Sequence, residues 1–145
     1  MSTLFNKRTA EDFGLVEKDG RFFRESDNSE WIKCKLYDNG WGDEEGFYKL
    51  PLGNFDELIN IVLSEGEEDS LGAAAIIMNE YNDELKDYLI KLMNESPSKK
   101  TKRLLSKTFK LKYGTNRTAK NGMTIQEILD ESRYWEDIRD FYSND

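Results

Sequence analysis

Two stretches of this 145-residue chain carry side chains that could do chemistry, and their charges are opposite. The first is an acidic aromatic turn over residues 39–48, Asn-Gly-Trp-Gly-Asp-Glu-Glu-Gly-Phe-Tyr. Trp and Tyr are common anchors in protein interfaces, and clustered carboxylates attract basic partners. In the alternative interpretation the turn is an ordinary hairpin loop whose Trp folds back onto the sheet. The predicted partner-binding residues are Trp41, Asp43, Glu44, Glu45, Phe47 and Tyr48.

The second stretch is a basic segment over residues 97–122, which contains nine Lys and Arg side chains and no Asp or Glu. Residues 1–96, in contrast, hold 10 basic and 22 acidic side chains, and residues 123–145 hold 2 and 7. Such a segment can meet a phosphate backbone or an acidic protein, but it can equally pair with acidic faces of its own domain or face water. The residues of this alternative basic patch are Lys99, Lys100, Lys102, Arg103, Lys107, Lys110 and Lys112.

Most catalytic chemistry is excluded because the chain has no His and a single Cys, Cys34. His is the usual general base near neutral pH, so Ser-His-Asp and Cys-His arrangements cannot form. Zinc sites built from His and Cys are excluded for the same reason. The acidic turn lacks the alternating ligands of a calcium loop, and there is no glycine-rich phosphate loop. We therefore expect no enzymatic activity, no cofactor and no metal.

The composition indicates a folded domain with a highly charged surface. Hydrophobic residues make up 37 % and aromatic residues 12 %, which argues against disorder. The length fits one domain over residues 1–145, mainly β in residues 1–53 and mainly α in residues 54–145. No apolar run is long enough to span a membrane, and no signal-peptide pattern follows Met1, so we expect no membrane contact and a cytoplasmic location.

Residues 15–50 read as antiparallel strands. Asp19-Gly20 between two apolar runs is a hairpin signal. Residues 31–37 alternate with period two, as half-buried strands do, and a further strand is expected from Gly46 to Leu50. The pattern predicts an α+β fold that begins with an antiparallel meander of three to four strands and continues with four to five helices.

Residues 54–96 predict the first helices. Asn54 is expected to cap a helix whose apolar stripe runs from Phe55 to Val62. The acidic residues 64–69 are expected to form a loop before a second helix, and Asn82 is expected to cap a third.

The basic segment is expected to begin with a helix that Ser98 caps and that ends at Tyr113-Gly114. Thr124-Ile-Gln-Glu127 has the pattern of a capping box, in which the two side chains bond reciprocally to the backbone of a helix N-terminus. The last helix is expected to carry an apolar series, Ile125, Ile128, Leu129, Trp135, Ile138 and Tyr142.

A small acidic chain without His or catalytic motifs resembles, in general type, the small bacterial immunity and inhibitor proteins that cover the active surface of a toxin or another enzyme. This resemblance rests on composition and covers no motif. It implies a protein partner, such as a basic toxin or nuclease, held by the acidic surface. The alternative is nucleic-acid binding through residues 97–122. Because that segment spans an expected helix and loop between acidic helices, we expect it to belong to the fold, which favours the acidic surface as the external contact.

Overall fold

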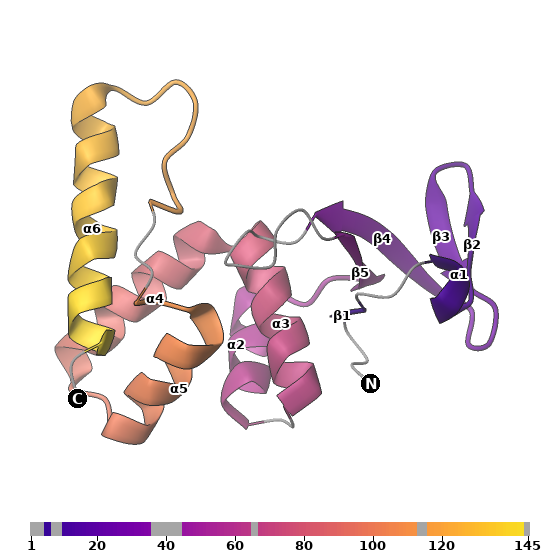
Figure 1. The fold of residues 1–145 in the computed structure, drawn as a ribbon, viewed down its shortest axis with the longest axis horizontal. Helices are drawn as coiled ribbons and strands as arrows, with labels where there is room; N and C mark the ends of the chain where they lie inside the picture. The colour runs from indigo at the N-terminus through magenta and orange to yellow at the C-terminus, as the bar shows by residue number, and fades with distance from the viewer. Residues whose placement is uncertain (1–4, 7–9, 36–44, 65–66, 113–115, 144–145) are drawn as a thin grey trace. The chain divides into compact units, whose positions relative to one another are not determined.

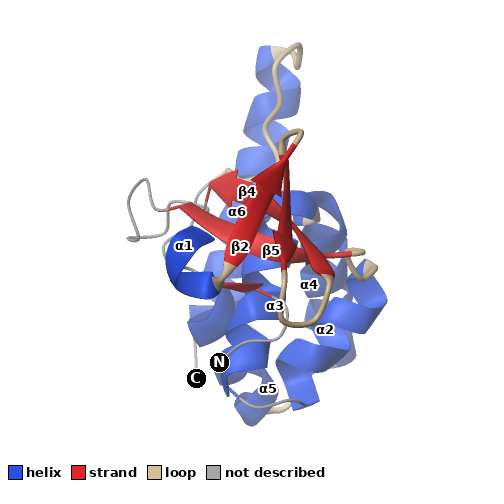
Figure 2. Ribbon diagram, turned by 90° about the vertical axis from the view of Figure 1, so that its right-hand side faces the viewer, coloured by secondary structure: helices blue, strands red, loops and turns tan. Residues whose placement is uncertain are grey.

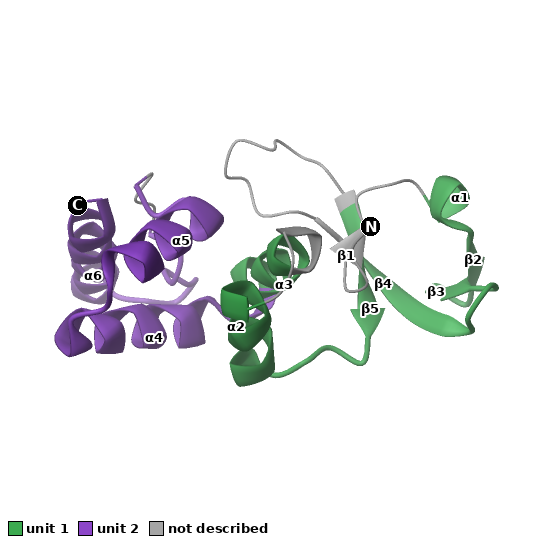
Figure 3. Cartoon of the chain, turned by 90° about the horizontal axis from the view of Figure 1, so that it is seen from below, with its two compact units in different colours: residues 1–79 green, residues 80–145 purple. Residues whose placement is uncertain are grey.

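The computed structural model describes residues 5–6, 10–35, 45–64, 67–112 and 116–143 (Figure 1). It confirms the α+β class, because an antiparallel sheet near the N-terminus is followed by helices (Figures 1 and 2). Contacts divide the chain into two compact units, residues 1–79 (unit 1) and residues 80–145 (unit 2), coloured separately in Figure 3. The expectation of a single domain over residues 1–145 stays a prediction.

The sheet of unit 1 has the strand order β1-β5-β4-β3-β2, with every neighbouring pair antiparallel. The predicted meander is formed by β2 (Leu15–Lys18), β3 (Arg21–Arg24), β4 (Ser29–Lys35) and β5 (Glu45–Leu50). The two-residue β1 (Phe5–Asn6) adds a short strand beside β5.

The hairpin between β2 and β3 forms where the sequence predicted it. Lys18 pairs with Arg21, so Asp19 and Gly20 alone make the loop. Their φ angles are 52° and 79°, the left-handed backbone that a two-residue loop of type I′ requires at both positions.

One face of the sheet holds the first core cluster of unit 1, which the short helix α1 (Ala10–Phe13) joins. The rings of Phe13 and Trp31 have centroids 4.8 Å apart. The indole Nε1–H of Trp31 donates to Ser29 Oγ at 2.7 Å, so its polar atom is satisfied although the residue is 2 % exposed. Ile32, the next residue along β4, is 47 % exposed. Trp31 therefore faces this core and Ile32 does not, but Lys33 is exposed as well, so burial over residues 31–33 does not follow the predicted period of two.

The helices of unit 1 are α2 (Phe55–Ser64) and α3 (Glu67–Glu80). Asn54 caps α2 as predicted, because its Oδ1 accepts the backbone N–H of Glu57 at 2.8 Å. The predicted acidic loop is shorter than expected, since α3 already begins at Glu67. Residues 73–78 are all buried, which covers more than one helical stripe and shows that α3 is packed on several sides.

Unit 2 contains α4 (Asn82–Glu95), α5 (Lys99–Phe109) and α6 (Ile125–Ser143). Asn82 does not cap α4: the capping position is Tyr81, whose carbonyl accepts the N–H of Leu85 at 2.9 Å, and no side chain completes the cap. Ser98 does cap α5, because its Oγ accepts the N–H of Thr101 at 3.1 Å.

Two helix ends in unit 2 decide the path of the chain between α5 and α6. Helix α5 stops at Phe109, earlier than predicted, because Lys110 adopts a left-handed conformation with a φ of 52°. The capping box of α6 is confirmed: Glu127 N–H donates to Thr124 Oγ1, and Thr124 N–H donates to Glu127 Oε1, both at 3.1 Å.

A polar network joins α4, α6 and the connecting segment inside unit 2. Lys86 Nζ lies 2.9 Å and 2.7 Å from the two carboxylate oxygens of Glu131, and the two side chains are only 13 % and 15 % exposed. Thr118 Oγ1 donates to Glu131 Oε2 at 2.9 Å and accepts the indole N–H of Trp135 at 3.0 Å. Around it lies the apolar core of unit 2, formed by Leu85, Leu89, Leu105, Phe109, Leu111, Trp135, Ile138 and Tyr142.

The buried ion pair gives a first testable prediction. In Lys86→Met the Glu131 carboxylate keeps its buried place but loses its cation, and we expect the free energy of unfolding to fall by about 3 kcal/mol. Urea denaturation followed by circular dichroism measures the loss. The matched control is Lys91→Met, on the exposed face of the same helix, where we expect a change within about 0.5 kcal/mol. Equal losses in the two variants would show that the pair does not hold unit 2 together.

A second prediction concerns alkaline pH. Burial, together with the neighbouring Tyr88, raises the pKa of Tyr142, whose hydroxyl donates to the Leu89 carbonyl at 2.8 Å. Above a pH of about 10 the unfolded chain releases this proton, whereas the folded chain keeps it. Deprotonation therefore stabilises the unfolded state, and the free energy of unfolding falls as pH rises.

Tyr142→Phe should therefore be less stable than the wild type near neutral pH, where the lost hydrogen bond costs about 1 kcal/mol, and this difference should shrink at alkaline pH. Urea midpoints on both sides of pH 10 measure the change. Tyr134→Phe, at an exposed tyrosine of the same helix, is the control and should change the free energy of unfolding by less than about 0.5 kcal/mol near neutral pH. A constant difference between Tyr142→Phe and the wild type would contradict the prediction.

Candidate functional site

The predicted acidic aromatic turn falls largely outside the described residues. This holds for Trp41, Asp43 and Glu44, and also for the side chain of Glu45, so their role in partner binding stays a prediction. Phe47 and Tyr48 are described, and both are buried, with exposed fractions of 4 % and 0 %. Their assignment to a contact surface is corrected, because both side chains belong to the core.

The burial of Phe47 and Tyr48 has a clear cause, since β5 is covered on both faces. Phe47 packs edge-on against Phe22 with centroids 5.1 Å apart, within the cluster on one face of the sheet. Tyr48 points to the other face, where its hydroxyl donates to the carbonyl of Ala75 on α3 at 3.3 Å and accepts a hydrogen bond from Asn79. A strand buried on both faces shows no simple alternation of polar and apolar residues, so periodicity could not mark Phe47 and Tyr48 as core residues.

Part of the basic segment is engaged inside unit 2. Arg117 is buried, and its guanidinium donates to the carbonyls of Phe109 and Lys110 at 2.7 Å and 3.2 Å, where α5 ends. Lys120 forms an ion pair with Asp83, and this contact raises the pKa of the lysine. The ammonium of Lys102 lies 4.3 Å from the ring centroid of Phe141. The expectation that the segment belongs to the fold is thus confirmed for these three residues.

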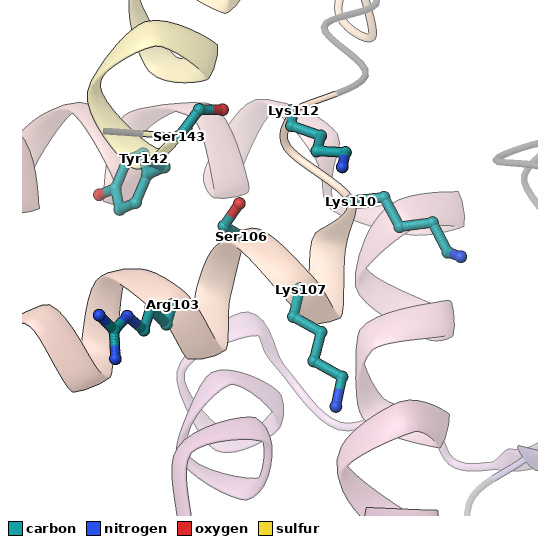
Figure 4. A pocket seen from close by; sticks show the side chains of 7 residues that line it. All are labelled: Arg103, Ser106, Lys107, Lys110, Lys112, Tyr142 and Ser143. Atoms are coloured by element: carbon teal, nitrogen blue, oxygen red, sulfur yellow. The ribbon is translucent and has the colours of Figure 1, made fainter. Parts of the chain in front are cut away.

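Other residues of the basic patch surround a hollow of about 390 Å³ in unit 2 (Figure 4). We call it the basic hollow. Of the predicted patch, it brings together four members, whereas Lys99, Lys100 and Lys102 do not line it. Its described lining residues are Arg103, Ser106, Lys107, Lys110, Lys112, Tyr142 and Ser143.

Helix geometry explains why these cations gather. Arg103, Lys107 and Lys110 are spaced i, i+4, i+7, which places them along one side of α5 and its C-terminal cap. Because the left-handed Lys110 turns the chain, Lys112 comes back beside the end of α5. In Figure 4 Ser106 points toward Tyr142 and Ser143, while the ammonium groups of Lys107 and Lys110 point outward.

The chemistry available in the basic hollow is charge attraction and hydrogen bonding. No Asp or Glu occurs among its described lining residues. The Tyr142 hydroxyl is engaged with the Leu89 carbonyl, and burial raises the pKa of this side chain, so it stays protonated at neutral pH and serves as a wall. The other described lining residues supply cations and serine hydroxyls, a set that can hold an anion.

A second surface of unit 2 was predicted only as part of a helical stripe. The apolar series of α6 divides into two sets: Trp135, Ile138 and Tyr142 are buried, whereas Ile125, Ile128 and Leu129 are 79 %, 38 % and 54 % exposed. We call the exposed set the apolar strip. At 3.6 residues per turn, Ile125 and Leu129 lie about a third of a turn from the buried set. Ile128, however, lies seven residues before Trp135 and is in phase with the buried set, so helical phase alone does not separate the two sets.

The apolar strip lies at the N-terminal end of α6. The first turns of this helix extend past the ends of α4 and α5 (Figures 1 and 2). The helix carries six acidic and two basic side chains, so its net charge is negative, and one of the two basic residues, exposed Arg133, lies four residues beyond Leu129. Exposed Asp130 lies one residue beyond the strip, and Glu136 lies seven residues beyond Leu129 on the same side of the helix.

Every helix within the described residues is too short or too polar to span a membrane. The described residues also contain no group of three or more Cys, Asp or Glu side chains placed to hold a metal ion.

Comparison with known proteins leaves the function to be argued from the chain itself. No family model matches the sequence, and no match was found to a curated protein or to a solved structure. The basic hollow and the apolar strip are therefore the two features on which a functional argument can rest.

Proposed function

We propose that this chain is a non-enzymatic protein-binding module that docks the apolar strip of α6 onto a basic partner protein. The observation that carries the proposal is the exposure of Ile125 and Leu129, at 79 % and 54 %, on a regular helix. Aliphatic side chains grouped in water are unfavourable unless something covers them, and such groups mark interaction sites.

The spacing of the strip favours one mode of binding. Ile125, Ile128 and Leu129 stand at i, i+3 and i+4, the spacing with which an amphipathic helix places anchors in the groove of a partner. The capping box fixes the first turn of α6, and the network through Glu131 fixes the helix one turn further along. A surface held in place before binding loses little conformational entropy when it docks.

Charge defines the partner. Residues 123–145 carry seven acidic and two basic side chains, so a partner with Lys and Arg around an apolar groove is complementary. Complementary charges raise the association rate and suppress wrong partners, whereas the apolar anchors supply most of the affinity. The acidic residues Asp43, Glu44 and Glu45 add to the same preference at the level of sequence.

The finer proposal is an inhibitor of the immunity type, which acts in the bacterial cytoplasm by covering the functional surface of a basic toxin or nuclease. It rests on the general resemblance in composition and on the net negative charge of α6. Binding without catalysis agrees with a chain that has no His to act as a general base.

Nucleic-acid binding through residues 97–122 is the second candidate. It is favoured by the four basic side chains that gather around the basic hollow. It is weakened by the engagement of Arg117 and Lys120 within unit 2, which removes two cations from a phosphate-binding surface.

Site-specific cross-linking tests the main proposal. A photoreactive phenylalanine analogue at position 129 should cross-link one basic protein in extracts of the source cells, and the same analogue at exposed position 91 on α4 should not. The yield should fall as salt is raised, because the charges around the strip become screened. A product that forms equally from both positions, or only a cross-link of the chain to itself, would contradict the proposal.

The purified partner then allows a quantitative test. Replacing Ile125 and Leu129 by Ser should weaken binding at least about 10-fold in calorimetry, because exposed anchors that become buried in an interface carry most of its energy. Gln126→Ala, on another side of the same helix, is the matched control and should bind like the wild type. An inhibitor should also suppress the partner's activity at the concentrations at which it binds.

A further inference from the structure

We infer that the basic hollow is a binding site for a small phosphate-bearing ligand, held by Arg103, Lys107, Lys110 and Lys112. This site is separate from the apolar strip and goes beyond the proposed docking function. It involves the C-terminal end of α6, whereas the strip belongs to the first turns of that helix.

The size and composition of the hollow fit such a ligand. Its volume of about 390 Å³ lies in the range of small-molecule pockets, which is about 300–1,000 Å³. Four basic side chains around one hollow can neutralise the charge of a phosphate or of linked phosphates. Ser106 and Ser143 add hydroxyl groups that can donate to phosphate oxygens.

Placing these cations together has a cost for the helix. Arg103 and Lys107 are like charges at i and i+4 of α5, a spacing at which like charges repel and destabilise a helix. Helix α5 contains no acidic residue that could offset this repulsion from within. An anion in the hollow would attract both charges, so a bound phosphate should also raise the stability of the protein.

The lysines beside the hollow can reach such an anion. The ammonium groups of Lys107 and Lys110 point outward in Figure 4, and each stands on a four-carbon stem with several rotatable bonds. Lys107 is exposed, so it can turn toward a ligand without disturbing the core.

The walls favour a small phosphate ligand over a nucleic-acid strand. Proteins that bind single strands stack successive bases on aromatic side chains. Tyr142 is the single aromatic residue among the described lining residues. Because it is only 3 % exposed and its hydroxyl donates to the Leu89 carbonyl, its ring offers little surface for stacking. A long polyanion would also meet the rest of the chain, where acidic side chains outnumber basic ones by 29 to 12.

Calorimetric titration of the full chain at low salt tests the inference, with inorganic phosphate, tripolyphosphate and a short DNA duplex as probes. Tripolyphosphate should bind more tightly than phosphate, because it offers more charge to the same cations, and it should raise the thermal midpoint. The DNA duplex should bind more weakly than tripolyphosphate. Failure of tripolyphosphate to bind at low salt would overturn the inference.

Two double variants with the same charge change separate the hollow from general electrostatics. Arg103→Gln with Lys107→Gln should weaken tripolyphosphate binding at least about 10-fold, since two charged partners are lost. Lys99→Gln with Lys100→Gln, on the first turn of the same helix and outside the hollow, should weaken it less than about 3-fold, because more distant exposed charges are screened. Equal effects of the two pairs would show diffuse attraction and overturn the inference.

A charge-retaining variant keeps the test valid if the glutamine variant proves unstable. Lys107→Arg preserves the positive charge and the helical residue type, and it should bind tripolyphosphate within about 3-fold of the wild type. Loss of binding in this variant would contradict recognition by charge. If the DNA duplex binds most tightly and both glutamine pairs weaken it equally, the basic segment is a nucleic-acid surface and the small-ligand site is wrong.

Discussion

The buried pair of Lys86 and Glu131 is the constraint on which the arrangement of unit 2 depends. Neither charge can remain in the interior alone, because the cost of removing an ion from water is met only while its partner stays beside it. The pair therefore holds α6 against α4. Two hydrogen bonds extend the network, since the Thr118 hydroxyl donates to the same carboxylate and accepts the indole N–H of Trp135. The segment between α5 and α6 is held by the same network as the helices.

The two candidate surfaces lie at opposite ends of α6, the helix that this network holds in place. At the N-terminal end, the capping box begins α6 and leaves the apolar strip exposed beyond the polar network. At the C-terminal end, Tyr142 bonds to Leu89 on α4 and forms a wall of the basic hollow. Arg117 completes the arrangement, because it binds the carbonyls of Phe109 and Lys110 where α5 ends and the chain turns. A helix held in this way offers the apolar strip as a preformed surface, and a preformed surface binds at a lower entropic cost.

The unusual charge distribution gains a structural meaning from these contacts. The basic segment serves two purposes: Arg117, Lys120 and Lys102 make contacts within unit 2, and the residues around the hollow create a local positive field in an acidic protein. The acidic side chains of α6 lie on the same helix as the exposed aliphatic residues, which gives the apolar strip a charge that selects among partners. An acidic docking surface and a basic ligand site can coexist because salt screens exposed charges over about 10 Å.

The sequence by itself determined the features that depend on neighbouring residues. The Asp19-Gly20 hairpin, the caps at Asn54 and Ser98, and the capping box of Thr124 with Glu127 all form as predicted, because turns and caps are local contacts between residues a few positions apart. The α+β class and the meander followed from periodicity, which is also local. What only the tertiary structure decided was burial. It placed Phe47 and Tyr48 in the core, left Ile125 and Leu129 exposed, and gathered four cations around one hollow. Whether a side chain is buried or exposed depends on which element packs against it, and that contact joins residues far apart in the chain.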